Sequence, residues 1–123
     1  MWRKYNPNPQ GKAVGDCTVR AISKALGKRW EEVYIDLCDM GLKMCDMPSA
    51  NAVWGAYLHR QGFKRSVIPN TCPTCYTVDD FCHEHPRGVY ILALSGHVCC
   101  VCNGDVFDSW DSRSETPIYF WEA

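Results

Sequence analysis

Apolar residues in the first half of the chain recur every three or four positions, the spacing that places them on one face of a helix. Glycines follow the ends of these runs, as expected where a helix stops. The pattern predicts three helices, over residues 17–26, 30–40 and 49–61. Residues 6–9 read Asn-Pro-Asn-Pro, which disfavours both helix and regular strand pairing. We therefore expect an irregular arm over residues 1–15.

The second half carries shorter apolar runs separated by turn residues, a pattern typical of strands. We expect a short helix over residues 77–81 and strands over residues 66–68, 88–94, 97–102, 106–110 and 117–121. Asn103-Gly104 joins two of these runs and is the strongest short hairpin signal. The last run is typical of an edge strand. Helices followed by hairpin-connected strands predict an α+β fold, with N-terminal helices packed on a small antiparallel β-sheet in one domain, residues 1–123.

Composition and charge narrow the classes of function. The 123 residues are 46% hydrophobic and 22% charged, and the formal net charge is −1. This balance gives no electrostatic reason to expect nucleic acid or a membrane surface as a partner. No apolar run reaches the length of a membrane span, and the first residues lack the apolar core of a secretion signal. We therefore expect a cytoplasmic protein, with its oligomeric state left open.

The most informative residue is Cys17, at the start of the first predicted helix. Asp16 is a good N-cap residue, because its carboxylate can accept from free backbone N–H groups of the first turn. The thiol would lie among those N–H groups at the positive end of the helix dipole, which stabilises the thiolate. The alternative is that Cys17 is a small buried apolar residue, as most free cysteines are.

The predicted hairpin brings a histidine and an acid together. A two-residue Asn-Gly turn pairs Cys102 with Asp105 and His97 with Trp110. Side chains alternate between the faces of a strand and paired residues share a face, so Asp108 lies diagonally across from His97. A shift of the turn by one residue leaves Asp108 and Trp110 on that same face. We therefore expect an imidazole–carboxylate pair.

A cysteine at a helix start and a histidine facing an acid are the parts of a nucleophilic thiol site. The thiolate attacks a carbonyl carbon, while the imidazole first stabilises the thiolate and then protonates the leaving amine. The acid fixes the imidazole tautomer. Distance along the sequence is no objection, because such partners meet only in the folded chain.

These segments resemble those of papain-like cysteine peptidases. Gly-Asp-Cys opens a helix at Cys17, Gly-His-Val begins a strand at His97, and Asp-Ser-Trp at Asp108 is similar to the family's Asn-Ser-Trp segment. The compact chain looks most like small bacterial and phage members, including those that resemble bacteriocin-leader peptidases. The resemblance implies a papain-like fold and a peptide or protein substrate, cleaved at a peptide or isopeptide bond through a thioester. It implies Cys17 as nucleophile, His97 as general acid and base and Asp108 as orienting residue, with no cofactor required.

The resemblance also implies a side-chain amide that donates to the oxyanion, beside the backbone N–H of Cys17. The family's glutamine usually lies about six residues before the cysteine, where this chain has Gly11. Gln10 and Asn8 are the candidates, provided that the arm bends to bring one of them to the thiol. Trp110 matches a tryptophan that shields the histidine pair from water in the family, although it could instead be a cross-strand packing residue.

Other functions stay open for the same residues. An acyltransferase would use the same triad. A catalytically inactive binding module with a peptidase-like fold would hold Cys17 as a core thiol and His97 as a satisfied buried histidine.

The remaining cysteines suggest a third interpretation. The chain has nine cysteines, and their odd number and dispersed spacing favour reduced thiols over a disulfide framework. Cys72, Cys75, Cys82 and His85 form a C-x2-C and C-x2-H set of the kind that binds zinc, which would give a zinc-stapled structural protein. The spacer between the two pairs is short for a zinc module, so the alternative is a loop with free thiols. Core-packing thiols are expected on the histidine's strand, at Cys99, Cys100 and Cys102.

Overall fold

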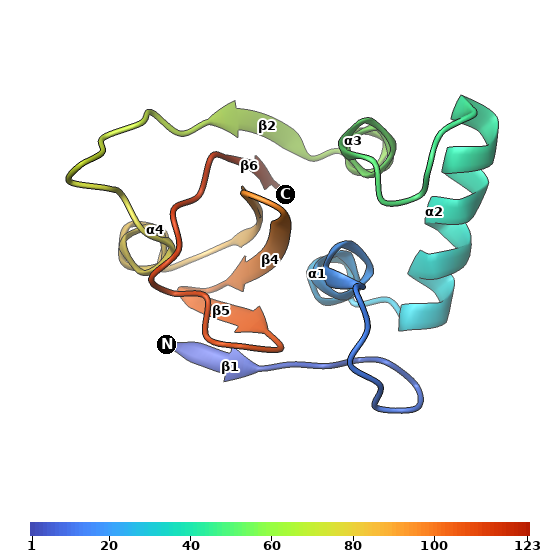
Figure 1. Ribbon diagram of the computed structural model, residues 1–123, viewed down its shortest axis with the longest axis horizontal. Coiled ribbons are helices and arrows are strands. Elements are labelled where there is room, and N and C mark those ends of the chain that lie inside the picture. Colours follow the sequence, from blue (N-terminus) through green and yellow to red (C-terminus); the bar gives the residue numbers. More distant parts are fainter.

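The computed structural model describes residues 1–123, and its helices and strands follow the predicted order with one addition. The elements are β1 (Trp2–Lys4), α1 (Cys17–Leu26), α2 (Trp30–Met44), α3 (Asn51–Arg60), β2 (Lys64–Val67), α4 (Val78–Glu84), β3 (Val89–Leu94), β4 (His97–Cys102), β5 (Asp105–Asp108) and β6 (Tyr119–Glu122) (Figure 1). The chain is therefore a mixed α+β protein. None of its helices combines the length and the apolar character needed to cross a membrane.

The six strands form one sheet in the order β1-β5-β4-β3-β6-β2. The prediction of a purely antiparallel sheet is wrong, because β1 pairs with β5 in parallel. The arm is therefore not irregular throughout: its first residues cover the edge of β5, whose backbone groups would otherwise lack partners. The last strand was expected at an edge, but β6 lies between β3 and β2.

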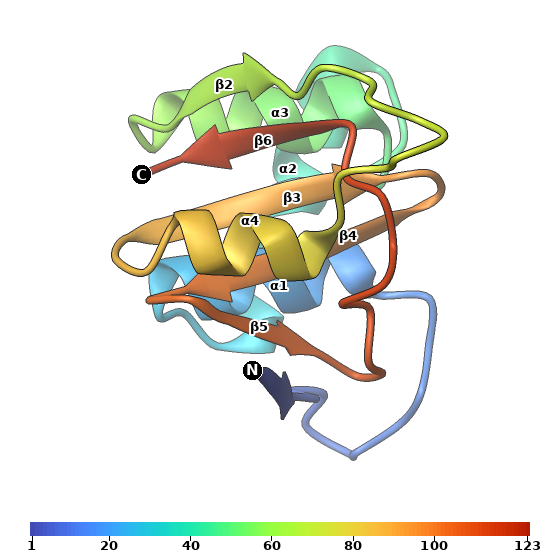
Figure 2. The ribbon, with the colours of Figure 1, turned by 90° about the vertical axis from the view of Figure 1, so that its left-hand side faces the viewer.

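Helices cover both faces of the sheet, in unequal numbers. Helices α1, α2 and α3 lie on one face and α4 lies on the other, as the two views show (Figure 1, Figure 2). The first face buries a cluster of fifteen residues that includes Ile22, Leu37 and Trp54 from the helices and Ile91 from the sheet. The second face buries a smaller cluster of nine, centred on Phe81 of α4. The larger cluster fixes α1 against β4, and this contact positions the site described below.

The predicted helix boundaries are confirmed at α1 and differ at α2. Gly27 follows α1 in the left-handed conformation, at φ 65°. Helix α2 continues past Gly41 to Met44, and Cys45 takes the left-handed position at φ 53°. Gly41 serves a different purpose: a Cβ there would lie 2.7 Å from the backbone oxygen of Asp46. The glycine therefore lets the chain fold back closely against the helix on its way to α3.

The predicted hairpin is confirmed in position and register. Asn103 and Gly104 both have positive φ, at 49° and 79°, as a two-residue turn of the type I′ class requires. Cys102 pairs with Asp105, and β4 and β5 run antiparallel from there. His97 is the first residue of β4 and Asp108 is the last of β5, so both residues lie at the open end of the hairpin.

Candidate active site

Helix α1 begins at Cys17, whose side chain is partly exposed. The residue before it does not cap the helix as predicted, because the side chain of Asp16 makes no hydrogen bond to the backbone of the first turn. Its carboxylate instead accepts from the Arg20 guanidinium and, at 2.8 Å, from the indole N–H of Trp30. Backbone N–H groups of the first helical turn have no carbonyl partner within the helix, so they leave the Cys17 thiol in an electropositive setting.

The hairpin places His97 against Asp108. The His97 Nε2–H donates to Asp108 Oδ2 at 2.6 Å, and the Asp108 carboxylate is fully buried. Because Nε2 is engaged, Nδ1 is the nitrogen left to face the thiol. Cys17 and His97 lie close enough that each shifts the pKa of the other. The three residues named from the sequence are therefore brought together.

The pKa of Cys17 lies below its ordinary value. Burial alone would raise it, because a low-dielectric surrounding disfavours the thiolate. Interaction with the His97 imidazole and with the backbone N–H of Val98 outweighs that penalty. A thiol in this position is therefore more readily ionised than a free cysteine.

The pKa of His97 is raised to about 9. Burial opposes the shift, while the hydrogen bond to Asp108 and the interaction with Cys17 overcome it. The pKa of Asp108 lies below its ordinary value despite burial, because His97, Ser112 and the Ser109 backbone N–H all stabilise the carboxylate. These directions favour a thiolate beside an imidazolium over a neutral thiol beside a neutral imidazole.

A buried arginine, which the sequence analysis did not single out, holds the acid in place. Arg20 Nη2 donates to Asp108 Oδ1 at 3.1 Å, while its Nη1 bonds Asp16. The side chain of Arg20 is only 6% exposed. Charges consequently alternate in a row from Asp16 through Arg20 and Asp108 to His97 and Cys17. The sequence did contain a signal for Arg20, because three- and four-residue spacing places residues 16, 17 and 20 on one side of a helix.

Ser112 and Trp110, which follow Asp108 in the chain, complete the surroundings of the His97–Asp108 pair. The Ser112 hydroxyl donates to Asp108 Oδ2 at 2.8 Å. The Trp110 ring lies over His97 with its centroid 4.9 Å away, although Trp110 itself is 42% exposed. The indole therefore covers the imidazole from solvent, and the His97 side chain is 14% exposed. The two side chains meet as expected, but β5 ends at Asp108 rather than at residue 110, so Trp110 is not strand-paired with His97.

Cys17 and His97 line a cleft of about 430 Å³ between the helical layer and the ends of β3 and β4. Asn51, at the start of α3, supplies the one side-chain amide of its lining. Trp54 Nε1–H donates to Asn51 Oδ1 at 3.1 Å, which orients the amide and leaves its NH2 group available. Sequence reasoning missed this residue, since nothing along the chain connects it with Cys17.

The predicted oxyanion donors are not brought to the thiol. Asn8 Oδ1 accepts from the backbone N–H groups of Gln10 and Lys12, so this side chain shapes the arm itself. Gln10 is exposed. Both residues line a separate hollow against Trp30, and neither lines the cleft that holds Cys17. Turns within the arm direct both side chains away from the cleft, so the condition on which they were candidates is not met.

The four residues of the predicted zinc set do not come together. Cys72 and Cys75 form a disulfide in the loop between β2 and α4, which corrects the expectation of reduced thiols there. Cys82 is a residue of α4 and is buried in the smaller core cluster. The His85 ring stacks on Phe81 at 3.8 Å, and its Nδ1–H donates to the Phe81 carbonyl. No group of three or more potential metal ligands forms anywhere in the chain.

The cysteines of β4 pack as expected for two of three positions. Cys99 and Cys100 are buried on opposite faces of the sheet, and burial raises the pKa of each well above its ordinary value. Cys102 is partly exposed near the hairpin turn. The lowered pKa of Cys17 thus sets it apart from Cys99 and Cys100.

Comparison with protein-family models, with curated proteins and with solved structures gives no match. Function is therefore inferred from the residues of the cleft.

Proposed function

We propose that the protein is a cysteine hydrolase of the papain-like type, which cleaves a peptide or isopeptide bond through a thioester intermediate. One observation carries the proposal. Cys17 and His97 line the same cleft and shift each other's pKa, and the Nε2–H of His97 bonds a buried carboxylate at 2.6 Å. The layout, with the thiol on a helix and the imidazole on a facing sheet, supports the papain-like assignment. The mechanism requires Cys17 in its reduced form, and Cys17 is a free cysteine.

The reaction uses the protons already in the site. The Cys17 thiolate forms a C–S bond to the carbonyl carbon, and the carbonyl oxygen takes the electron pair. As the C–N bond breaks, the His97 imidazolium gives its proton to the leaving amine. Water then attacks the thioester, His97 takes a proton from that water, and the acid product leaves as the thiolate is restored. Asp108 and Arg20 keep the imidazole oriented throughout.

The oxyanion needs donors that are already in place. The backbone N–H of Cys17 lies in the first turn of α1 and is free of an intrahelical partner. The NH2 group of Asn51 is our candidate for the second donor, because it lines the cleft and is oriented by Trp54. Asn51 takes the role that the sequence analysis gave to Gln10 or Asn8.

A non-catalytic binding module is the second candidate. The observation in its favour is that neither amide expected from the sequence lines the cleft. In that case Cys17 would bind a partner's backbone without acylation, and removal of the sulfur would leave binding intact.

The test is cleavage of a peptide library derived from whole-cell protein, with products read by mass spectrometry. The parent is expected to produce new peptide ends that are missing with Cys17→Ala. Cys45→Ser is the matched control, since Cys45 is an exposed free cysteine outside the cleft. Equal cleavage by the parent and Cys17→Ala, or cleavage by neither, contradicts the proposal.

A further inference from the structure

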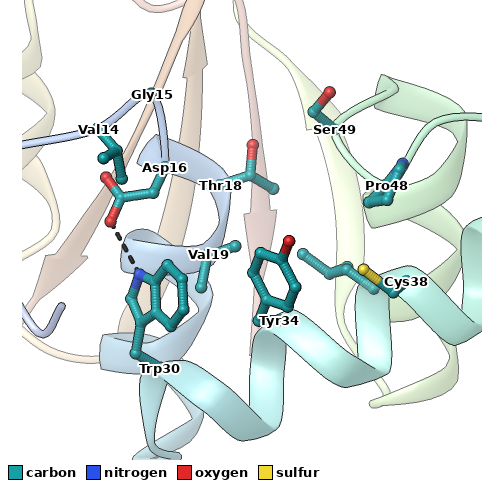
Figure 3. Close-up of a pocket in the computed structure, with 11 residues that line it drawn as sticks. Val14, Gly15, Asp16, Thr18, Val19, Trp30, Tyr34, Cys38, Pro48 and Ser49 are labelled. Atoms are coloured by element: carbon teal, nitrogen blue, oxygen red, sulfur yellow. Dashed lines mark hydrogen bonds between the residues drawn. The ribbon is translucent and has the colours of Figure 1, made fainter. Parts of the chain in front are cut away.

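A second pocket adjoins the cleft on the side of Cys17 away from the sheet. Its volume is about 280 Å³, and it lies between the start of α1, the side of α2 and the segment before α3. Figure 3 shows Trp30, Tyr34 and Cys38 rising from α2 on one side, with Pro48 and Ser49 at the rim opposite. No sheet residue contributes to it.

The pocket is continuous with the cleft. Gly15, Thr18 and Ser49 line both hollows. Gly15 carries no side chain and has open space where a Cβ would lie, so it leaves the connection unobstructed. A chain held in the cleft with its carbonyl at Cys17 can therefore direct one side chain past Gly15 into the pocket.

The lining selects the chemistry of that side chain. Its walls are formed mainly by apolar residues, and Trp30 and Tyr34 stack at 5.0 Å on one side. The single charged residue is Asp16, and its two carboxylate oxygens are already bonded to Arg20 and Trp30. A cationic side chain would lose hydration and find no free counter-charge, whereas the predominantly apolar wall favours an apolar side chain.

We infer that this pocket is the specificity subsite of the proposed hydrolase and holds one large apolar or aromatic side chain of the substrate near the scissile bond. The inference rests on the proposed function. Sites for whole small molecules span roughly 300–1,000 Å³, so about 280 Å³ suits a single side chain. The substrate class is thus a peptide with a leucine-like or phenylalanine-like residue beside the cleaved bond.

Alkylation of Cys17 by acetyl-dipeptidyl chloromethyl ketones measures the preference directly. The thiolate displaces chloride, so a C–S bond replaces the C–Cl bond and no turnover is needed. The probes carry Gly, Leu, Phe, Asp or Lys at one position and Gly at the other. Each rate is divided by the rate at which the same protein reacts with iodoacetamide, which reports on the thiol alone. Leu and Phe probes are expected to exceed the Gly, Asp and Lys probes by about tenfold or more at one position.

Two variants locate the preference in the pocket. Tyr34→Ala removes a wall residue that is itself 50% exposed, and it is expected to reduce the advantage of Phe over Gly by about tenfold. Cys38→Phe fills the pocket and is expected to reverse the preference in favour of Gly. Ile35→Ala is the control, because Ile35 is an exposed apolar residue on the same helix outside the pocket.

The outcomes separate this inference from the proposed function. Fast iodoacetamide alkylation of Cys17 with equal rates for all peptidyl probes overturns the subsite and leaves the proposed function standing. A preference that Tyr34→Ala and Cys38→Phe change no more than Ile35→Ala also overturns it. Failure of iodoacetamide to react faster with Cys17 than with the exposed thiol of Cys45 contradicts the proposed function itself.

Discussion

Cys17 has a histidine close to it in space and Cys82 has one close to it in sequence, yet the pKa values of the two thiols are shifted in opposite directions. Cys17 lies beside His97 in a cleft, and its pKa is below the ordinary value. Cys82 precedes His85 by three residues at the end of α4, and burial raises its pKa to about 11. The histidine that lowers the pKa of a cysteine is therefore the one eighty positions away in the sequence.

The difference lies in where each imidazole is held. The His85 ring stacks flat on Phe81, and its Nδ1–H is used by a carbonyl of the same helix. The His97 ring is held by a buried carboxylate, and Arg20 and Ser112 in turn fix that carboxylate. A thiol is activated by an imidazole that a rigid surrounding keeps both charged and oriented, and proximity along a helix does not supply that.

Replacement of His97 or of His85 by alanine is expected to show the largest difference between the two cysteine–histidine pairs. His97→Ala is expected to lower peptide cleavage by on the order of 10⁴–10⁶, because it removes both the partner of the thiolate and the proton donor. His85→Ala is the matched control and is expected to leave the rate per folded molecule unchanged. Rates of product formation for the two variants, with folding checked by circular dichroism, make the comparison. A similar loss in both variants would contradict it.

The buried arginine gives the next largest effect. Arg20→Leu leaves Asp16 and Asp108 without their shared cation, and loss of one partner from a buried ion pair costs about 3–5 kcal/mol. Arg29→Leu removes an exposed arginine paired with Glu32 and is expected to cost less than about 1 kcal/mol. Urea unfolding followed by fluorescence measures both. Equal stability of the two variants would show that Arg20 does not organise the site.

The side-chain amides of Asn51 and Gln10 give the smallest predicted effect, and they again contrast a residue in the cleft with one that is only closer to Cys17 in sequence. Asn51→Ala is expected to lower the turnover rate by about 10²–10³, the cost of removing one oxyanion donor. Gln10→Ala, close to Cys17 in sequence but outside its cleft, is expected to have no effect. The measurement is the turnover number at saturating peptide. A loss with Gln10→Ala and none with Asn51→Ala would return the role to the arm.

Local patterns predicted much of what positions the triad. The apolar spacing of residues 17–26 and the glycine after them define α1, because a helix needs only near neighbours. The Asn-Gly turn sets the register that brings His97 toward Asp108, since a two-residue turn leaves little freedom. These features depend on contacts within a few residues or across one hairpin.

The rest depends on contacts that no local pattern specifies. Strand β1 has three residues and pairs with β5, about a hundred positions away, where Arg3 bonds Asp105. Asn51 reaches the cleft only because α3 packs against α2, which in turn packs against α1. Cys72 and Cys75 likewise form a disulfide, whereas their spacing alone was compatible with free thiols or with the zinc alternative.

The rate at which iodoacetamide alkylates Cys17 as a function of pH tests the central claim, that His97 holds Cys17 as a thiolate. The folded pKa of His97 is raised to about 9, so the imidazolium persists at neutral pH and is lost only as pH rises through that value. In the parent, the alkylation rate should therefore rise at a pH below the ordinary pKa of cysteine. In His97→Ala the rise should move to higher pH, leaving at pH 7 only the few per cent of thiolate typical of a free cysteine. Superimposable profiles for the parent and His97→Ala would contradict the account.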